Sequence, residues 1–151
     1  MTYGVSLEAM RLLFPQLTAA NSRLTSPFDE GYNCIAWAAA DTERWWWPDP
    51  QEQKYWPEKL PRVVTIDAFV KAYGLLGYLH KTDASLEPGR QKIAIFADEG
   101  GTPTHASRQL SDGWWTSKLG KQVDIEHELS ALEGSTYGKV AIVLGRTAKS
   151  T

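Results

Sequence analysis

One cysteine, Cys34, is the residue of this sequence with the clearest potential for chemistry. It follows a turn-rich segment, residues 26–31, and precedes an alanine-rich run, residues 36–40. Alanine favours helix, whereas glycine, proline and aspartate mark turns, so we expect Cys34 in the first turn of a short buried helix. The unpaired N–H groups there lower a thiol's pKa and make a nucleophilic thiolate available. The alternative, a small buried hydrophobic residue, stays open.

A catalytic thiol needs a base within hydrogen-bond reach and a third polar group that orients this base. The chain has three histidines. His80 is interpreted as a surface residue, and His127 falls on the polar side of a helix that we predict to begin at Asp124. His105 opens a predicted strand after a glycine- and proline-containing turn, where a base facing the start of the helix would have to lie. We therefore predict that Cys34 and His105 form a catalytic pair.

The residues themselves leave open which side chain orients His105. If Asp112-Gly113 is a two-residue hairpin turn, the pairing of the two strands places Ser117 on the opposite face of the sheet from His105. Asp124 is the nearest carboxylate downstream, although the start of a helix already explains it.

Neither a metal nor a cofactor is expected. A metal site built from Cys34, His105, His127 and Asp124 is conceivable, but the sequence has no Cys-x-x-Cys or His-x-x-x-His spacing. It also has no phosphate-binding glycine loop and no dinucleotide-binding fingerprint.

The composition is that of a soluble globular domain. The 151 residues suit one domain with its own core, and 42% are hydrophobic. A net charge of −2 favours neither nucleic acid nor an anionic membrane as a partner, and one cysteine excludes an internal disulfide. Because no signal sequence and no apolar run of membrane-spanning length is visible, a cytoplasmic location is the default expectation. Secretion by a signal-independent route stays open.

Hydrophobic periodicity predicts helices first and mostly strands afterwards. Helices are predicted at residues 5–17 (with Ser6 as N-cap), 34–42, 65–76 and 124–134. Strands are predicted at residues 92–97, 104–110, 114–119 and 137–146. This order indicates a single α+β domain over residues 1–151, with helices packed on one face of a small antiparallel sheet.

Seven tryptophans are unusual in so short a chain, and several lie in residues 43–62. Four prolines forbid long regular structure in this segment, so it is predicted to be a loop with anchored aromatic side chains. The loop either covers an edge of the core or forms a wall of a substrate cleft. In the second interpretation Trp46, Trp47 and Trp56, together with Tyr32, are the candidate substrate-binding residues.

Three short motifs resemble papain-like cysteine hydrolases, most of all their NlpC/P60-like branch. Tyr32-Asn33-Cys34 resembles the segment around that branch's nucleophile, and Thr104-His105-Ala106 resembles the start of its histidine strand. In the third motif, Trp115-Thr116-Ser117-Lys118-Leu119-Gly120, Ser117 would by position be the branch's third polar residue. The resemblance covers about residues 30–120. The whole chain also resembles an uncharacterised bacterial family with the motifs NCIAWA, THASRQL and WTSKLG.

The resemblance implies a papain-like fold and a thiol-dependent hydrolase or amidase that cleaves an amide or isopeptide bond in a peptide or protein. Cys34 would be the nucleophile and His105 the base, with Ser117 or Asp124 as third residue; a bacterial effector or toxin is one such setting. The alternative is a non-enzymatic interaction domain that binds a protein or glycan through its tryptophan-rich loop. An inactive relative with the same fold is a further reading.

Overall fold

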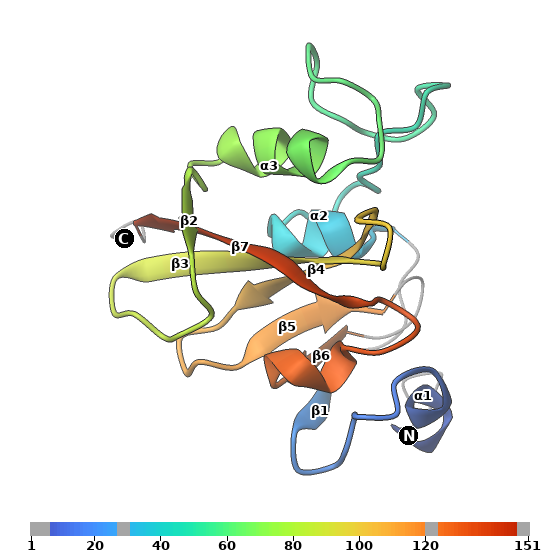
Figure 1. Cartoon of the computed structure of the whole chain (residues 1–151), viewed down its shortest axis with the longest axis vertical. Helices are drawn as coiled ribbons and strands as arrows, with labels where there is room; N and C mark the ends of the chain where they lie inside the picture. The colour runs from blue at the N-terminus through green and yellow to red at the C-terminus, as the bar shows by residue number, and fades with distance from the viewer. Residues whose placement is uncertain (1–6, 27–30, 120–123, 148–151) are drawn as a thin grey trace.

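The computed structural model describes residues 7–26, 31–119 and 124–147, and its centre is one sheet of seven strands (Figure 1). Neighbouring strands are antiparallel throughout, in the order β1-β6-β5-β4-β3-β7-β2. The strands are β1 Ser22–Ser26, β2 His80–Thr82, β3 Arg90–Ala97, β4 Pro103–Gln109, β5 Trp115–Lys118, β6 Asp124–His127 and β7 Lys139–Thr147. The prediction of a small antiparallel sheet combined with helices is confirmed.

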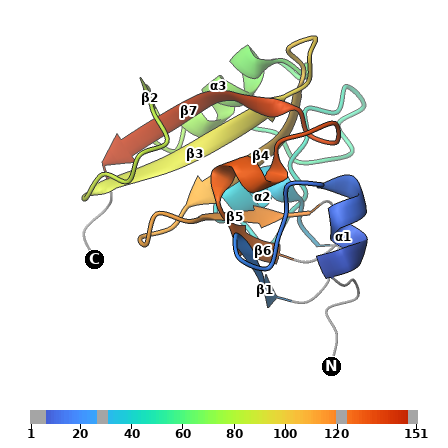
Figure 2. The same ribbon diagram turned by 60° about the horizontal axis from the view of Figure 1, so that its bottom comes forward.

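Helices cover both faces of this sheet rather than one (Figures 1 and 2). They are α1 Leu7–Leu13, α2 Cys34–Ala38, α3 Ile66–Gly74 and the 3-10 helix η1 Leu129–Leu132. Helices α2 and α3 share a buried cluster with Ile95, whereas α1 and η1 share one with Phe96. Because successive residues of a strand point to opposite faces, the two clusters lie on opposite sides of β3. The one-face prediction is wrong, since helical periodicity does not tell which face a helix will cover.

Two of the helices begin where the sequence predicts. Asn33 caps α2 by accepting a hydrogen bond from the Ala36 N–H, and Thr65 caps α3 by accepting one from the Ala68 N–H, both at 3.1 Å. Each cap satisfies one of the N–H groups that a helix start leaves unpaired. The proposed cap of the first helix, Ser6, lies outside the described residues.

The segment after residue 123 is the largest error in the predicted elements. Asp124 is not a helix cap but the first residue of β6, which lies between β1 and β5. The helix follows later and is only the single short turn η1. Pairing with strands distant in sequence decides this segment, and tertiary context overrides such local helix signals. Strands β1 and β2 were not predicted at all.

The predicted loop is confirmed: residues 43–62, all of which the structure describes, contain no helix and no strand of the sheet. A single bridge between Trp46 and Tyr55 closes it. Trp56 packs against Phe69 of α3, with ring centroids 5.3 Å apart, and its indole N–H donates to the Pro61 carbonyl at 3.0 Å. The loop is therefore anchored on the face of the sheet that α2 and α3 cover.

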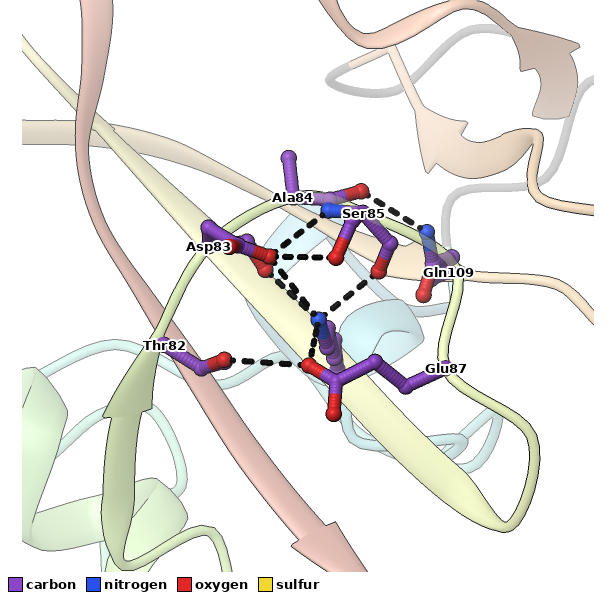
Figure 3. Close-up of polar contacts among 7 residues, drawn as sticks. Thr82, Asp83, Ala84, Ser85, Glu87 and Gln109 are labelled. Atoms are coloured by element: carbon purple, nitrogen blue, oxygen red, sulfur yellow. Dashed lines mark hydrogen bonds and ion pairs between the residues drawn. The ribbon is translucent and has the colours of Figure 1, made fainter.

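The connection between β2 and β3 is held by a buried lysine, Lys92, whose partners Asp83, Ser85 and Glu87 are labelled in Figure 3. The Lys92 ammonium donates to the carbonyls of Asp83 and Ser85, at 2.8 and 2.7 Å, and to the Glu87 carboxylate at 2.7 Å. Only 1% of the Lys92 side chain is exposed. Buried charges are usually paired in this way, because desolvation is costly otherwise.

Among the described helices, none is long and apolar enough to cross a membrane.

Candidate functional site

Cys34 is the first residue of α2, as predicted, and the side chain before it fixes its position. The Asn33 side-chain oxygen accepts the N–H groups of Ala36 and Trp46, at 3.1 and 3.0 Å. The Asn33 side-chain N–H donates to the Trp46 carbonyl at 2.7 Å. One buried amide therefore holds both the start of α2 and the tryptophan-rich loop.

The Cys34 thiol is a neutral thiol at rest. Burial raises its pKa from 9.0 to about 11, although the backbone N–H groups of Ala106, Ile35 and Cys34 and the charge of Lys118 act in the opposite direction. A thiolate at the helix start was expected, but desolvation outweighs the N–H groups. The same N–H groups nevertheless surround the sulfur with hydrogen-bond donors.

Cys34 also borders an open pocket of about 420 Å³. The pocket is lined by Asn33, Cys34, Trp45, Trp47, Asp49 and Lys54. The Lys54 ammonium lies 5.4 Å from the centre of the Trp45 ring. The thiol and the tryptophan-rich loop therefore share one open pocket, whose lining includes two tryptophans.

The four candidate substrate-binding residues are placed differently. Trp47 lines the pocket, and Trp45, which was not proposed, joins it. Trp46 and Trp56 are buried in the core that also contains α2 and α3. Tyr32 is buried as well, and its hydroxyl donates to the Asp124 carboxylate at 2.7 Å. Within the loop, alternation between buried and half-exposed positions decides which tryptophans can reach a ligand.

His105 is fully buried in β4 and lies within an aromatic and polar cluster. Its ring stacks on Tyr137, with centroids 4.0 Å apart and an interplanar angle of 8°, and contacts the Phe96 ring edge-on at 5.3 Å. Its Nε2 lies 3.0 Å from the Ser117 hydroxyl. Burial, with a smaller contribution from His127, lowers the pKa of His105 well below 6.5, so its imidazole is neutral.

Ser117 therefore shares a face of the sheet with His105, contrary to the expected register. Gln109 pairs with Trp115, not with Thr116. The hydrogen bond from the Leu110 N–H to the Trp114 carbonyl, at 2.7 Å, shows that the hairpin loop has three residues rather than two. A shift of one residue moves every side chain of a strand to the other face.

The Ser117 hydroxyl is the centre of a buried hydrogen-bond network. It lies 2.6 Å from the Ser107 hydroxyl and 2.7 Å from Nε2 of His127, whose Nδ1 lies 2.7 Å from the Glu128 carbonyl. His127 was expected on a helix surface, but it is a fully buried residue of β6. The spacing of Ile125 and His127 was a signal for a strand here, because residues two apart share one face of a strand.

Asp124 lies apart from this network. In the pairing of β5 with β6, Ser117 is opposite Ile125 and Lys118 is opposite Asp124, so Asp124 and Ser117 point to different faces. The structure thus brings Ser117, and not Asp124, to His105. Among the described residues, no group of three or more histidine, cysteine, aspartate or glutamate side chains is arranged to hold a metal ion.

Cys34 and His105 are not hydrogen-bonded, and their side chains lie on opposite faces of β4. Ala106 pairs with Ile95 and shares the buried cluster of Cys34, whereas His105 pairs with Phe96 and contacts the Phe96 ring on the other face. The N–H that reaches the sulfur belongs to Ala106, the residue directly after His105. The electrostatic influence of Cys34 extends to Tyr137, the ring that stacks on His105, and helps to raise the pKa of this tyrosine. Nδ1 of His105 is buried and has no hydrogen-bond partner among the described residues. The structure therefore does not bring the predicted pair together, because successive residues of β4 point to opposite faces and Ala106, not His105, faces α2.

Comparison with known proteins gives a family but no activity. A family model described as a domain of unknown function, DUF7689, matches residues 23–145. No curated protein and no solved structure was found to match the chain. The matched residues include Cys34, the tryptophan-rich loop and all members of the buried network.

Proposed function

We propose that this chain, which belongs to the DUF7689 family, is a papain-like thiol hydrolase that cleaves an amide or isopeptide bond. One observation carries the proposal: one ring nitrogen of His105 is held by Ser117, the other has no partner within the described part of the chain, and the N–H of the following residue, Ala106, reaches the Cys34 sulfur. A buried polar atom without a partner is rare and requires an explanation. A nitrogen kept for the proton of a thiol provides one.

The proposed reaction starts from a neutral thiol and a neutral imidazole. As the Cys34 sulfur attacks the substrate carbonyl, the thiol proton moves to Nδ1 of His105, and the carbonyl becomes an oxyanion. When the C–N bond breaks, the same proton passes to the departing amine, and a thioester remains on Cys34. Water, deprotonated by His105, then hydrolyses the thioester and restores the thiol.

The donors around the sulfur support this chemistry. The N–H groups of Cys34, Ile35 and Ala106 act on the Cys34 sulfur, and we propose the Cys34 N–H at the start of α2 as a donor to the oxyanion. Donors that are already oriented stabilise an oxyanion without reorganisation, and one such donor contributes about 10²–10³ in rate. The pocket lined by Trp45 and Trp47 is the proposed site for the acyl side of a peptide or protein substrate.

Because Cys34 and His105 lie on opposite faces of β4, this reaction requires substrate binding to rearrange β4 so that the imidazole reaches the thiol. Catalytic hydrogen bonds are often absent in unliganded enzymes and form in the substrate complex. Asn33 links the Cys34 helix to the loop that carries Trp47, so a substrate in the pocket contacts the segment that positions the sulfur.

A second candidate is a binding domain without catalysis. The raised pKa of Cys34 favours it, because a buried structural thiol is inert at neutral pH. In this case the half-exposed Trp45 and Trp47 would bind a peptide or glycan, and Cys34 would only form the pocket floor.

Acyl transfer to Cys34 distinguishes the two functions. The purified chain is mixed with p-nitrophenyl acetate and with a library of peptide aminocoumarin amides, and intact-mass spectrometry detects the acyl adduct. Because the chain has one cysteine, an adduct that is absent in Cys34→Ser locates the acyl group without digestion. We expect adduct formation and turnover in the parent, and a loss of about 10²-fold or more in His105→Ala.

The matched control is His80→Ala, which removes an exposed histidine of β2. It should react like the parent. If Cys34→Ser hydrolyses the substrates as fast as the parent, or if His105→Ala forms the adduct at the parental rate, the hydrolase proposal is wrong.

A further inference from the structure

We infer that His127, acting through Ser117, is a positioning residue that fixes His105 as its Nε2–H tautomer and so keeps Nδ1 as an unprotonated base. The tautomer follows from the hydrogen bonds alone. Only its catalytic consequence rests on the proposed function. Four side chains from three adjacent strands, β4, β5 and β6, make up this arrangement: His105, Ser107, Ser117 and His127.

The direction of the hydrogen bonds is set at the Glu128 carbonyl. A carbonyl oxygen only accepts, so Nδ1 of His127, 2.7 Å away, must carry a hydrogen. Burial keeps the ring neutral, since the pKa of His127 is lowered to about 4. A neutral imidazole has one N–H, so Nε2 of His127 is an acceptor.

The Ser117 hydroxyl transmits this constraint to His105. A hydroxyl has one hydrogen to donate and two lone pairs that accept. Its hydrogen goes to Nε2 of His127 at 2.7 Å, because that nitrogen can only accept. The lone pairs then face Ser107 at 2.6 Å and Nε2 of His105 at 3.0 Å, and both of these must donate. His105 therefore carries its hydrogen on Nε2.

The opposite tautomer of His105 would place two acceptors against each other. Its Nε2 lone pair would face the Ser117 oxygen, whose hydrogen is already used, in a fully buried site. Losing a buried hydrogen bond disfavours a state by about tenfold or more. The network therefore selects the tautomer whose Nδ1 can receive a proton, and this nitrogen has no partner among the described residues.

Nitrogen-15 NMR of the histidine side chains tests the inference without any substrate. In the parent at neutral pH we expect His105 as the Nε2–H tautomer and His127 as the Nδ1–H tautomer. Removal of the exposed His80 in His80→Ala simplifies the assignment. The finding that His105 carries its hydrogen on Nδ1 in the folded parent would overturn the inference by itself.

Two variants test the transmission. Ser117→Ala and His127→Phe should each move His105 from one tautomer to a mixture, with at least a severalfold increase in the Nδ1–H form. His127→Gln is the conservative control, because its amide oxygen can still accept the Ser117 hydrogen, and it should restore the parental tautomer. A merely structural role would lower the melting temperature but leave the tautomer of His105 unchanged, and this result in a folded variant would contradict the inference.

The tautomer test can succeed or fail independently of the acylation test of the proposed function. If the expected tautomers are found but Cys34 accepts no acyl group, the network is correct and the hydrolase proposal fails. If Cys34 is acylated but Ser117→Ala leaves the tautomer unchanged, the hydrolase proposal stands and the positioning role fails. Where both hold, Ser117→Ala should lower kcat severalfold with little effect on KM, because the Ser117 side chain is fully buried.

Discussion

The thiol of Cys34 should react slowly with small disulfide reagents in the folded protein and faster once the chain is unfolded. Its pKa is raised from 9.0 to about 11, and burial is the cause. Only the thiolate reacts. At pH 7.5 the thiolate fraction is therefore about 3 in 10,000 in the folded protein, against about 3 in 100 in the unfolded chain, a ratio of about 100.

Part of this difference is offset, because a thiolate of higher pKa is a stronger nucleophile. With a Brønsted coefficient of about 0.4–0.5, a rise of two pKa units increases the reactivity of the thiolate by about 6–10-fold. The folded protein should thus react at least about tenfold more slowly, and its limited exposure of 8% slows the reaction further. Because deprotonation is required, the rate should rise about tenfold per pH unit until pH approaches about 11.

The assay is the absorbance change of 4,4′-dithiodipyridine, with folded protein and protein in guanidinium chloride compared at each pH. One cysteine gives one exchange event per chain. A folded protein that reacts faster than the unfolded chain at neutral pH would show that Cys34 is a thiolate at rest. If His105→Ala then removed the fast reaction, an ion pair with His105 would be responsible, and the thiol and imidazole would not be neutral at rest.

Three further variants test how the site is supported. Gly138→Ala should lower the melting temperature strongly, because φ is +79° and the added Cβ would collide with the backbone of β3; Gly89→Ala, with φ of +80° and open space, should cost much less in the same thermal scan. Lys92→Met should cost roughly 1–3 kcal/mol in urea unfolding through the carbonyls left unpaired, whereas Lys71→Met, which removes an exposed ion pair, should cost less than about 1 kcal/mol. Asn33→Ala should cost about 1–2 kcal/mol for the lost cap and also change the tryptophan fluorescence; unchanged emission would show that the amide does not hold the loop.

Local signals were sufficient for the helix that carries Cys34 and for the strand that carries His105. Turn residues before an alanine-rich run predicted α2, and an Asp-Gly turn between two strand-like runs predicted β4 and β5. The papain-like fold stays a prediction, because the sheet order and the comparisons give only a mixed domain with an antiparallel sheet.

The buried network could not be predicted, because it depends on register and on distant pairing. One extra residue in the hairpin loop, with Gly113 at φ +93°, puts Ser117 beside His105. Asp124 and His127 sit in a strand only because β1 and β5 flank them, and nothing within four residues of sequence encodes those neighbours. The spacing of residues in the sequence therefore identifies candidate catalytic residues more readily than the contacts that these residues make.

The Asn33 amide makes the nucleophile and the binding wall mechanically dependent on each other. A ligand that displaces the Trp46 backbone also moves Asn33, the residue immediately before Cys34, through the two hydrogen bonds between the Asn33 side chain and the Trp46 backbone. A reorientation of the thiol distorts the same two hydrogen bonds. Across a series of ligands, occupancy of the pocket and reactivity of the Cys34 thiol should therefore vary together. Molecules too small to contact the indole rings of Trp45 and Trp47 should leave the thiol unreactive.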